Sequence, residues 1–420
     1  MKSSKRSMFL TPLNLITDKL VFNLANKFLL SFLVLIPLLV SCNKNEEYIA
    51  FHQAAFVADL HDDTPISILN GFDIGVRNSG GQIDMPRMRD GGMDLIFFSV
   101  WLFPSDYLEK DLAFQKANEI IDAVESVEQK YPAQLRLIRT ADEAISTVEE
   151  GMLAGTFGME GGYPIENDLS KLEHFYERGV RYFAPVWNNS TSWATSAEFE
   201  TTDTTNSVLG LTKFGREVIR KCNELGILID ISHAGDQTVK DILEITEDPI
   251  IASHSSVWSL TPHFRNLKDD QLRAIAAGGG VVFINFYSGY LDSTYQDKFD
   301  ALLETRKSEL DSIKEELEFL GRGEEFWDER NRFLKDDIEE IRPPFEALID
   351  HIDYVAKLVG VGHVGLGSDF DGVSSMPKGM DDVRDLPKIT QALLIRGYSK
   401  QDIKKILGEN LLRVFRRVVG

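Results

Sequence analysis

Residues 228–266 read LIDISHAGDQTVKDILEITEDPIIASHSSVWSLTPHFRN, two short apolar runs separated by a helical pattern. The first run, residues 227–232, is followed by His233, and the second run, residues 249–253, is followed by His254. Strand, helix and strand in this order predict two neighbouring parallel strands. Ligands of parallel sheets and barrels bind at the carboxyl ends of the strands. We therefore expect the two imidazoles to lie side by side at the mouth of a barrel.

The same alternation of apolar runs and helical patterns extends along the chain. Apolar, β-rich runs occur at residues 56–60, 93–101, 153–159, 180–186, 227–232, 249–253, 280–285 and 364–368. Helical patterns occur at residues 105–130, 141–150, 168–178, 212–225, 236–246, 268–277, 344–359 and 399–418. Such alternation predicts a parallel sheet with helices outside it. Its repetition along the chain predicts a closed (β/α)8 barrel of the TIM type.

One charged segment interrupts this regular spacing. Residues 291–343 lie between the seventh and eighth runs, are rich in Glu and Lys, and carry apolar residues at heptad-like positions. The pattern predicts a helical insertion between strands seven and eight, at the mouth of the barrel. Two interpretations remain open for it. It is either a solvated helical excursion or a lid or subunit contact, and the second would be consistent with a homodimer.

The amino-terminal residues predict an export signal. Residues 28–40 are apolar, basic residues precede them, and the sequence LVSC ending at Cys42 resembles a bacterial lipobox. We expect a signal peptide at residues 1–41, lipid on Cys42, a tether at 42–50 and the barrel at 51–420. The chain would then be an exported bacterial lipoprotein, anchored in a membrane and facing the periplasm or the cell surface. The alternative is an ordinary signal anchor with an incidental cysteine.

Charge and cysteine content narrow the possible partners. The chain carries a formal net charge of −21, which argues against binding to nucleic acid and against charge-driven docking on anionic lipid. Cys222 is the only cysteine besides Cys42. An intrachain disulfide is therefore not expected if Cys42 is acylated.

Side chains that can bind metal follow several of the predicted strands. His61 and Asp63 lie two residues apart after the first run, so they point the same way from an extended chain. Glu160 ends the third run and precedes two glycines, which allow close approach of the backbone. Each signal is weak alone, because an H-x-D pattern or a Glu in a glycine-rich turn is common.

Together with His233 and His254, these residues form a much stronger signal. Three imidazoles and two carboxylates, without a thiolate, are a ligand set that suits zinc and similar ions. Five protein ligands are too many for one open catalytic zinc ion. They suit two ions that share a carboxylate and leave room for a bridging hydroxide.

Two further residues are candidates for contact with a substrate. Asp369 follows the eighth run and would face the same mouth, either as a metal ligand or as a base and anchor for a substrate ammonium group. Arg265 lies in the loop after His254 and could offer a guanidinium fork to a carboxylate. A surface arginine paired with Asp269 or Asp270 is the alternative.

The motifs DLHDDTP, GMEGG, LIDISH, SHSS, RNLKDD, NFYSGY and GSDFDG occur in this order from about residue 56 to the carboxyl-terminal part of the chain. This ordered set resembles the membrane (renal-type) dipeptidases of the metal-dependent hydrolase superfamily. The resemblance implies a hydrolase barrel with two zinc ions. It also implies cleavage of dipeptides, including dipeptides with a D-residue at the carboxyl end.

The resemblance implies a role for each motif residue. The residues implied to bind zinc are His61, Asp63, Glu160, His233 and His254, with Glu160 shared by the two ions. Asp369 would handle the substrate amine and the proton, and Arg265 and Tyr290 would hold the free carboxylate. The chain departs from the mammalian-type members at Trp187, where they carry a histidine close to the scissile carbonyl. Asn188 is then a candidate to take the part of that histidine.

Two other classes of function remain open. Barrels with similar metal sites hydrolyse lactones, phosphotriesters or cyclic amides, but such substrates need no carboxylate clamp of the kind that Arg265 and Tyr290 would form. A non-catalytic lipoprotein could bind peptides or glycans on a retired barrel. The intact set of metal-binding residues argues against this second class.

Overall fold

The computed structural model describes residues 47–203, 207–323 and 326–420. The predicted signal peptide, Cys42 and most of the predicted tether therefore lie outside the described residues. None of the described helices is both long enough and apolar enough to cross a membrane. Contacts within the chain divide it into two units, Met1–Phe51 and His52–Gly420, and the fold described below is that of the second unit.

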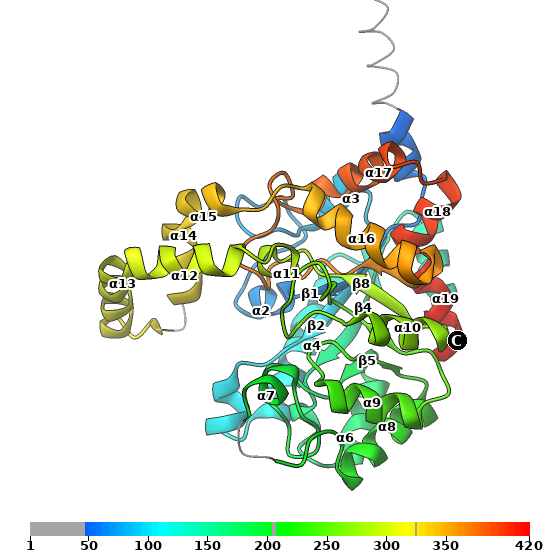
Figure 1. The fold of residues 1–420 in the computed structure, drawn as a ribbon, viewed down its shortest axis with the longest axis horizontal. Coiled ribbons are helices and arrows are strands. Elements are labelled where there is room, and N and C mark those ends of the chain that lie inside the picture. The colour runs from blue at the N-terminus through cyan, green and yellow to red at the C-terminus, as the bar shows by residue number, and fades with distance from the viewer. Residues whose placement is uncertain (1–46, 204–206, 324–325) are drawn as a thin grey trace, which may run out of the picture. The chain divides into compact units, whose positions relative to one another are not determined.

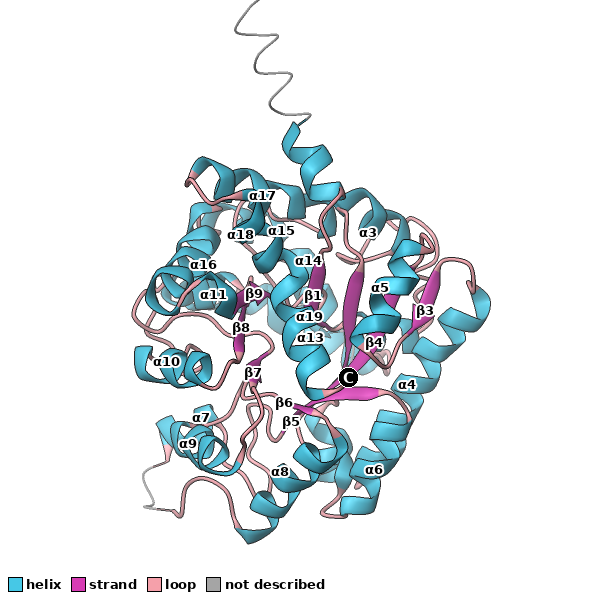
Figure 2. Cartoon of the chain, turned by 90° about the vertical axis from the view of Figure 1, so that its right-hand side faces the viewer, coloured by secondary structure: helices cyan, strands magenta, loops and turns pink. Residues whose placement is uncertain are grey.

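Parallel strands form the centre of this unit and are arranged in two sheets. One sheet has the order β1-β2-β4-β5-β6, with β3 paired to β4, and the other has the order β7-β8-β9. The strands are β1 Ala58–Asp62, β2 Leu95–Val100, β3 Leu135–Leu137, β4 Leu153–Glu160, β5 Val180–Ala184, β6 Leu228–Ile229, β7 Ile251–Ala252, β8 Val281–Ile284 and β9 Val364–Leu366. The strands curl in the manner of a TIM-like barrel (Figure 2).

Isolated backbone bridges connect the two sheets. Asp62 at the end of β1 pairs with Phe370 beyond β9, and Asp230 beyond β6 pairs with Ile251 of β7, both in the parallel sense. Each of the eight predicted apolar runs overlaps one strand. The sequence did not predict β3, because three residues are too few to show a period of two.

Strands β6 and β7 are shorter than the predicted runs for an identifiable reason. The Asp230 carboxylate accepts hydrogen bonds from the backbone N–H groups of Ser232 and Ser253. The Ser232 hydroxyl accepts another from the backbone N–H of His254. Side chains therefore satisfy backbone donors that a longer sheet ladder would otherwise satisfy. The chain is thus free to turn at the two histidines.

Helices surround the strands, as the alternation predicted (Figure 1). The α-helices that lie outside the stretch between β8 and α16 are α2 Thr64–Leu69, α3 Met85–Gly91, α4 Ala113–Lys130, α5 Ala141–Glu149, α6 Leu169–Glu177, α7 Ala197–Thr202, α8 Lys213–Leu225, α9 Asp236–Ile245, α10 Asp269–Ala277, α16 Glu346–Val359, α17 Leu386–Ile395, α18 Lys400–Lys404 and α19 Asn410–Val418. The single helix predicted at residues 105–130 is wrong. A π-helical turn at Ser105–Glu109 precedes α4, and Asp111, at φ 51°, interrupts the helical backbone between them.

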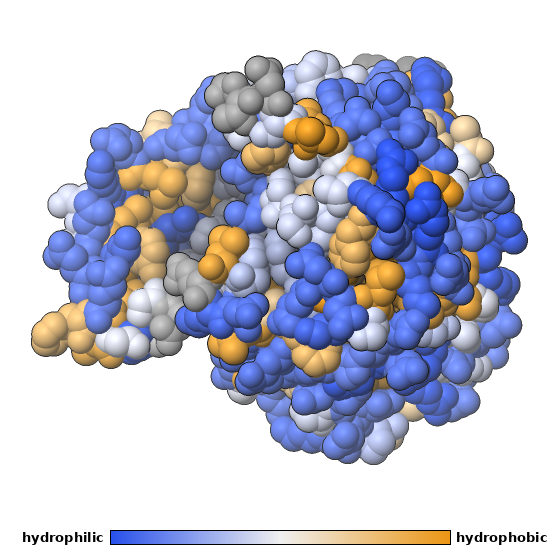
Figure 3. Space-filling view, turned by 90° about the horizontal axis from the view of Figure 1, so that it is seen from below, coloured by the Kyte–Doolittle hydropathy of each residue, from blue (hydrophilic) through white to orange (hydrophobic). Residues whose placement is uncertain are grey.

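The chain between β8 and α16 forms a set of short helices. They are α11 Ser288–Leu291, α12 Tyr295–Thr305, α13 Lys307–Phe319, α14 Phe326–Phe333 and α15 Lys335–Ile341. Helices α12–α15, here called the helical arm, extend to one side of the strands (Figure 1) and have a small core of their own around Tyr295 and Phe299. Apolar side chains are also exposed on the arm (Figure 3), most of all Phe319, which is 89% exposed.

A cluster of aromatic rings fills part of the interior between the strands. The ring of Phe97 in β2 lies 5.8 Å from the ring of Tyr182 in β5 and 5.6 Å from the ring of Phe415 in α19. All three side chains are fully buried. Phe415 and other side chains of α19 belong to the same buried cluster as Ala58 and Leu95 at the starts of β1 and β2. This cluster fills the interior at the amino-terminal ends of those strands. The carboxyl ends remain available for a site.

This packing predicts a large loss of stability for Phe415→Ala. Removing a fully buried ring leaves a cavity, so we expect the free energy of unfolding in urea to fall by about 3–5 kcal/mol. The matched control is Ile395→Ala, because Ile395 on α17 is 80% exposed; its effect should stay within about 0.5 kcal/mol. Equal losses for the two variants would contradict the assignment of α19 to the core.

Candidate metal centre

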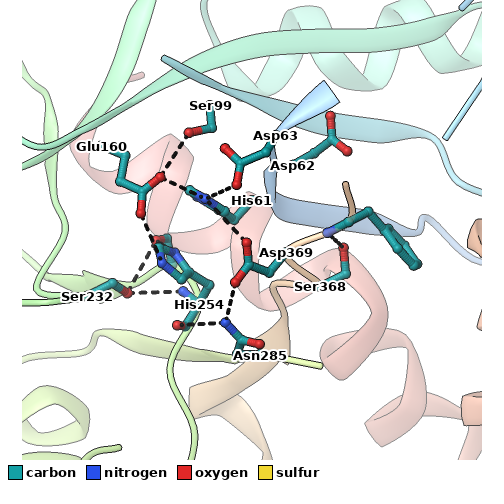
Figure 4. A network of polar contacts seen from close by, with 12 residues as sticks. His61, Asp62, Asp63, Ser99, Glu160, Ser232, His254, Asn285, Ser368 and Asp369 are labelled. Carbon is teal, nitrogen blue, oxygen red and sulfur yellow. Dashed lines mark hydrogen bonds and ion pairs between the residues drawn. The ribbon is translucent and has the colours of Figure 1, made fainter. Parts of the chain in front are cut away.

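His61 in β1 lies close both to the Glu160 carboxylate that ends β4 and to Asp63, which follows β1. His61 Nε2 lies 3.3 Å from Glu160 Oε2 and 3.7 Å from Asp63 Oδ2. Asp369, which follows β9, is close as well, with Oδ1 3.9 Å from His61 Nε2. Residues that are as far apart in the chain as 61 and 369 thus converge at one end of the strands (Figure 4).

The other oxygen of Glu160 faces the two histidines after β6 and β7. Glu160 Oε1 lies 2.9 Å from His233 Nε2 and 3.5 Å from His254 Nε2. The two Nε2 atoms lie 3.0 Å apart, so the imidazoles are side by side, as the sequence of this region predicted. The Glu160 carboxylate therefore directs one oxygen to His61 and the other to the two histidines after β6 and β7, and the rings of His61 and His254 lie 3.8 Å apart.

The donor atoms at this centre fit divalent metal ions. Ligand atoms of His61, Glu160 and His254 lie within 4.8 Å of one another, and so do those of His61, Asp63 and Asp369. His61 Nε2 and Asp63 Oδ1 are buried without a hydrogen-bond partner. Buried polar atoms without a partner are rare and costly, and a cation among them would satisfy both. Imidazole nitrogens and carboxylate oxygens are also the donors that zinc accepts.

Backbone strain marks the same centre. His233 has φ 68° and Asp369 has φ 65°, both in the left-handed region that residues other than glycine rarely occupy. Such conformations cost about 1–3 kcal/mol each and are concentrated at functional sites. The turns place these two side chains toward Glu160 instead of continuing the strands.

Hydrogen bonds on the far side of two imidazoles fix their orientation. His61 Nδ1 lies 2.6 Å from the Tyr182 hydroxyl. His254 Nδ1 lies 2.7 Å from the Ser253 hydroxyl, which in turn donates to the Asp230 carboxylate at 2.5 Å. If each Nδ1–H donates outward, each Nε2 keeps a lone pair directed at the centre.

Tyr182, Ser253 and Asp230 are parts of the centre that were not predicted from the sequence. Tyr182 lies inside an apolar strand and cannot be distinguished there from an ordinary core residue. A usable signal existed for Asp230, because it is the only charged residue in the apolar run 227–232. A buried carboxylate inside a strand requires donors nearby.

Asn188 has a different contact from the one predicted. Its side-chain oxygen lies 2.8 Å from His233 Nδ1, so it orients this imidazole in the way that Tyr182 orients His61. The predicted contact with substrate remains a prediction for Asn188. Its neighbour Trp187 is half-buried, with its ring 6.1 Å from the His233 ring.

Electrostatics prepare the centre for a cation. Burial lowers the pKa of His233 to about 3 and holds the pKa of His254 well below its usual value, so both imidazoles are neutral at pH 7. Burial opposes ionisation of Glu160, but the charge on His61 and the polar contacts with the other two histidines hold its pKa well below its usual value. Burial likewise opposes protonation of His61, yet the surrounding Tyr182, Glu160 and Asp63 raise its pKa well above its usual value. A proton on His61 thus offsets the negative charge of the carboxylates. A bound metal ion would replace this proton.

Asp369 differs from the other carboxylates of the centre. Burial raises the pKa of Asp369 to about 7. Its Oδ2 accepts a hydrogen bond of 2.8 Å from the Asn285 side chain, which leaves Oδ1 directed toward His61. A carboxyl group with such a pKa can both accept and release a proton near neutral pH.

Arg265 lies at the centre and not at the surface. It is 3% exposed, and its guanidinium donates to the backbone oxygen of His254 at 3.2 Å. The alternative of a surface pair with Asp269 or Asp270 is therefore wrong. Its Nε is buried without a partner, and the guanidinium carbon lies 5.4 Å from the centre of the Tyr290 ring.

A model of one protein family matches almost the whole described chain. The family is described as Membrane dipeptidase (Peptidase family M19), and the match covers residues 46–419. The chain belongs to the membrane dipeptidase family. The family resemblance of the ordered motifs is thereby confirmed.

Individual members of the family agree with this assignment. The chain is 31% identical over 379 residues to Dipeptidase 3 of Mus musculus, covering 89% of this chain and 66% of that relative. A metallopeptidase from Rhodobacter sphaeroides, solved with a phosphinate mimic of the dipeptide L-Ala-D-Ala, matches with a TM-score of 0.70 and 25% identity over 87% of this chain and 99% of its own. A probable dipeptidase from Pseudomonas aeruginosa matches with a TM-score of 0.75 and 25% identity over 89% of this chain and 98% of its own.

The outer hydrogen bond to His61 predicts an effect on metal binding in this family member. Tyr182→Phe removes the hydroxyl beside Nδ1 and keeps the buried ring. We expect zinc affinity, measured by competition with a chromogenic chelator, to fall by about 10- to 100-fold. Tyr398→Phe is a matched control, because the Tyr398 hydroxyl donates to Asp353 and not to a residue of the metal centre. The orienting role fails if both variants bind zinc as the parent chain does.

Proposed function

We propose that this chain hydrolyses dipeptides, including dipeptides with a carboxyl-terminal D-residue, with two zinc ions bound. The observation that carries the proposal is the position of Glu160, with one oxygen toward His61 and the other toward His233 and His254. Family membership supports this substrate class, and so does the dipeptide mimic bound to the related Rhodobacter sphaeroides enzyme.

We also infer the architecture and location that accompany this activity. The catalytic domain is a closed (β/α)8 barrel over residues 51–420, with the insertion 291–343 between its seventh and eighth strands. A signal peptide at 1–41 and lipid on Cys42 make the protein an exported, membrane-anchored lipoprotein of the periplasm or cell surface. The helical arm is consistent with a homodimer.

The residues of the centre divide the chemistry among them. His61 and Asp63 would hold one ion, His233 and His254 would hold the other, and Glu160 would be shared by both. When bound, zinc ions lower the pKa of a water molecule toward ~7 and polarise the scissile carbonyl group. Asp369 binds the substrate ammonium group and passes a proton to the leaving amine, a step that suits its pKa of about 7.

Arg265 and Tyr290 bind the free carboxylate of the substrate, so the substrate must carry one. The buried guanidinium has an unpartnered Nε and stands beside the phenol ring of Tyr290. A carboxylate would satisfy this donor and neutralise the buried charge. The clamp selects short peptides, because only their carboxyl end lies close to the scissile bond. Trp187 and Asn188 line the opposite side, where they contact the rest of the substrate.

The two alternative functions are less consistent with these contacts. A hydrolase for lactones or cyclic amides would leave the buried Arg265 without an anionic partner. His233 and Asp369 both have strained backbone, which lowers the stability of the fold. A non-catalytic binding lipoprotein gives no reason for this strain. Dipeptide hydrolysis uses both features.

Glu160→Gln tests the shared ligand. We expect turnover of a zinc-loaded chain on dipeptides to fall by at least about 100-fold, because an amide cannot hold two cations as a carboxylate does. Zinc content after dialysis should fall as well. Glu150→Gln, at an exposed pair with Arg136, is the matched control and should behave as the parent chain. Near-parental turnover of Glu160→Gln with full zinc content would refute the bridging role.

A comparison of free and amidated dipeptides tests the clamp. The parent chain should cleave Ala-Ala at least about 100-fold more efficiently, in kcat/KM, than its carboxyl-terminal amide, because the amide leaves Arg265 unpaired. In Arg265→Met this preference should nearly vanish, mainly through slower cleavage of the free peptide. Equal cleavage of both peptides by the parent chain would show that the clamp assignment is wrong.

A further inference from the structure

A cluster of aromatic rings lies beside the metal centre, and only one of them, Trp187, has been given a contact with substrate above. It consists of Trp101, Phe103 and Trp187, here called the aromatic wall. The ring of Trp101 lies 4.8 Å from that of Phe103 and 5.3 Å from that of Trp187, both in edge-to-face geometry. Trp187 in turn lies 6.1 Å from the His233 ring, so the wall reaches the centre.

The fold places the wall next to Glu160. Trp101 follows β2 and Trp187 follows β5, and these strands are the two partners of β4 along the sheet order. Ser99, two residues before Trp101, donates to Glu160 Oε2 at 3.2 Å, so the end of β2 is already in contact with the centre. Side chains two residues apart on an extended chain point to the same side.

The wall is open and is also held in place. Phe103 is 44% exposed, and both tryptophans are only half-buried. The Trp187 backbone N–H donates to the Tyr163 hydroxyl, which donates to the backbone oxygen of Asn189. The Tyr163 ring stacks on Tyr107 at 3.8 Å, which fixes it in turn. Exposed aromatic surface on a fixed backbone beside a catalytic centre is suited to bind an apolar group.

The two sides of the centre determine which part of a dipeptide meets the wall. Arg265 follows β7 and Tyr290 follows β8, both strands of the other sheet. If the clamp holds the carboxylate there, the carboxyl-terminal residue lies on that side of the ions. The ammonium group of the amino-terminal residue is held by Asp369, whose Oδ1 lies 3.9 Å from Nε2 of His61 in β1, and β1 pairs with β2, which Trp101 follows. The side chain of the amino-terminal residue then reaches the aromatic wall.

We propose that Trp101, Phe103 and Trp187 form the subsite for the side chain of the amino-terminal residue and select aromatic or large apolar side chains there. This inference rests on the proposed dipeptidase activity and adds its specificity. The wall carries no charged group, so a Lys or Glu side chain in that position would lose solvation without gaining a partner. A Phe or Leu side chain would bury its own apolar surface and that of the wall.

The test compares three dipeptides on the zinc-loaded full chain: Ala-Ala, Phe-Ala and Ala-Phe. The parent chain should favour Phe-Ala over Ala-Ala in kcat/KM. Trp101→Ala should lower that ratio by about tenfold, while the ratio of Ala-Phe to Ala-Ala stays within about twofold of the parent value. Phe103→Ala, at a more exposed ring, should act in the same direction and is available if Trp101→Ala does not fold. Phe319→Ala, at the exposed ring on the helical arm, is the matched control and should leave both ratios unchanged.

The outcomes separate this inference from the activity on which it rests. Cleavage of Ala-Ala at the parental rate by Trp101→Ala and Phe103→Ala, with an unchanged Phe-Ala ratio, would overturn the aromatic wall alone. A loss that falls on Ala-Phe would assign the wall to the carboxyl-terminal residue and overturn the inference as well. Failure of the zinc-loaded parent chain to cleave any of the three dipeptides would refute the dipeptidase proposal itself.

Discussion

The Glu160 carboxylate is the constraint on which the rest of the site depends. A single buried side chain at the end of β4 has one oxygen near His61 and the other near His233 and His254. Such an arrangement would be unfavourable without positive charge, because buried carboxylates need cations or several donors. Without an ion, a proton on His61 supplies part of that charge. The proposed zinc pair would supply more of this positive charge and would also supply the chemistry of hydrolysis.

The surrounding fold maintains this arrangement through outer contacts. Tyr182, Asn188 and the Ser253–Asp230 pair each fix one imidazole from behind. Asp230 also takes the backbone donors that would have extended β6 and β7. A single buried carboxylate therefore both ends two strands and, through Ser253, orients a histidine of the candidate metal centre. The aromatic packing of α19 at the opposite end of the barrel leaves the carboxyl ends free for this use.

The sequence predicted the features that depend on local patterns and on strand ends. Alternating apolar runs and helical patterns were sufficient for the parallel strands, and polar residues at the strand ends were sufficient for the convergence of His61, Asp63, Glu160, His233 and His254. Features set by tertiary contacts were not predictable. Tyr182 looks like any core tyrosine, β3 is too short to show a period, and the break before α4 depends on one residue in a left-handed conformation. The aromatic wall was not predictable because Trp101 and Trp187 lie in loops that are far apart in the sequence.

Crystals grown with zinc test whether two zinc ions share Glu160. Anomalous difference maps collected on either side of the zinc absorption edge should show two peaks per chain. One should lie among His61, Asp63 and Glu160, and the other among Glu160, His233 and His254. A single peak, or two peaks that Glu160 does not join, would show that Glu160 is not shared by two ions.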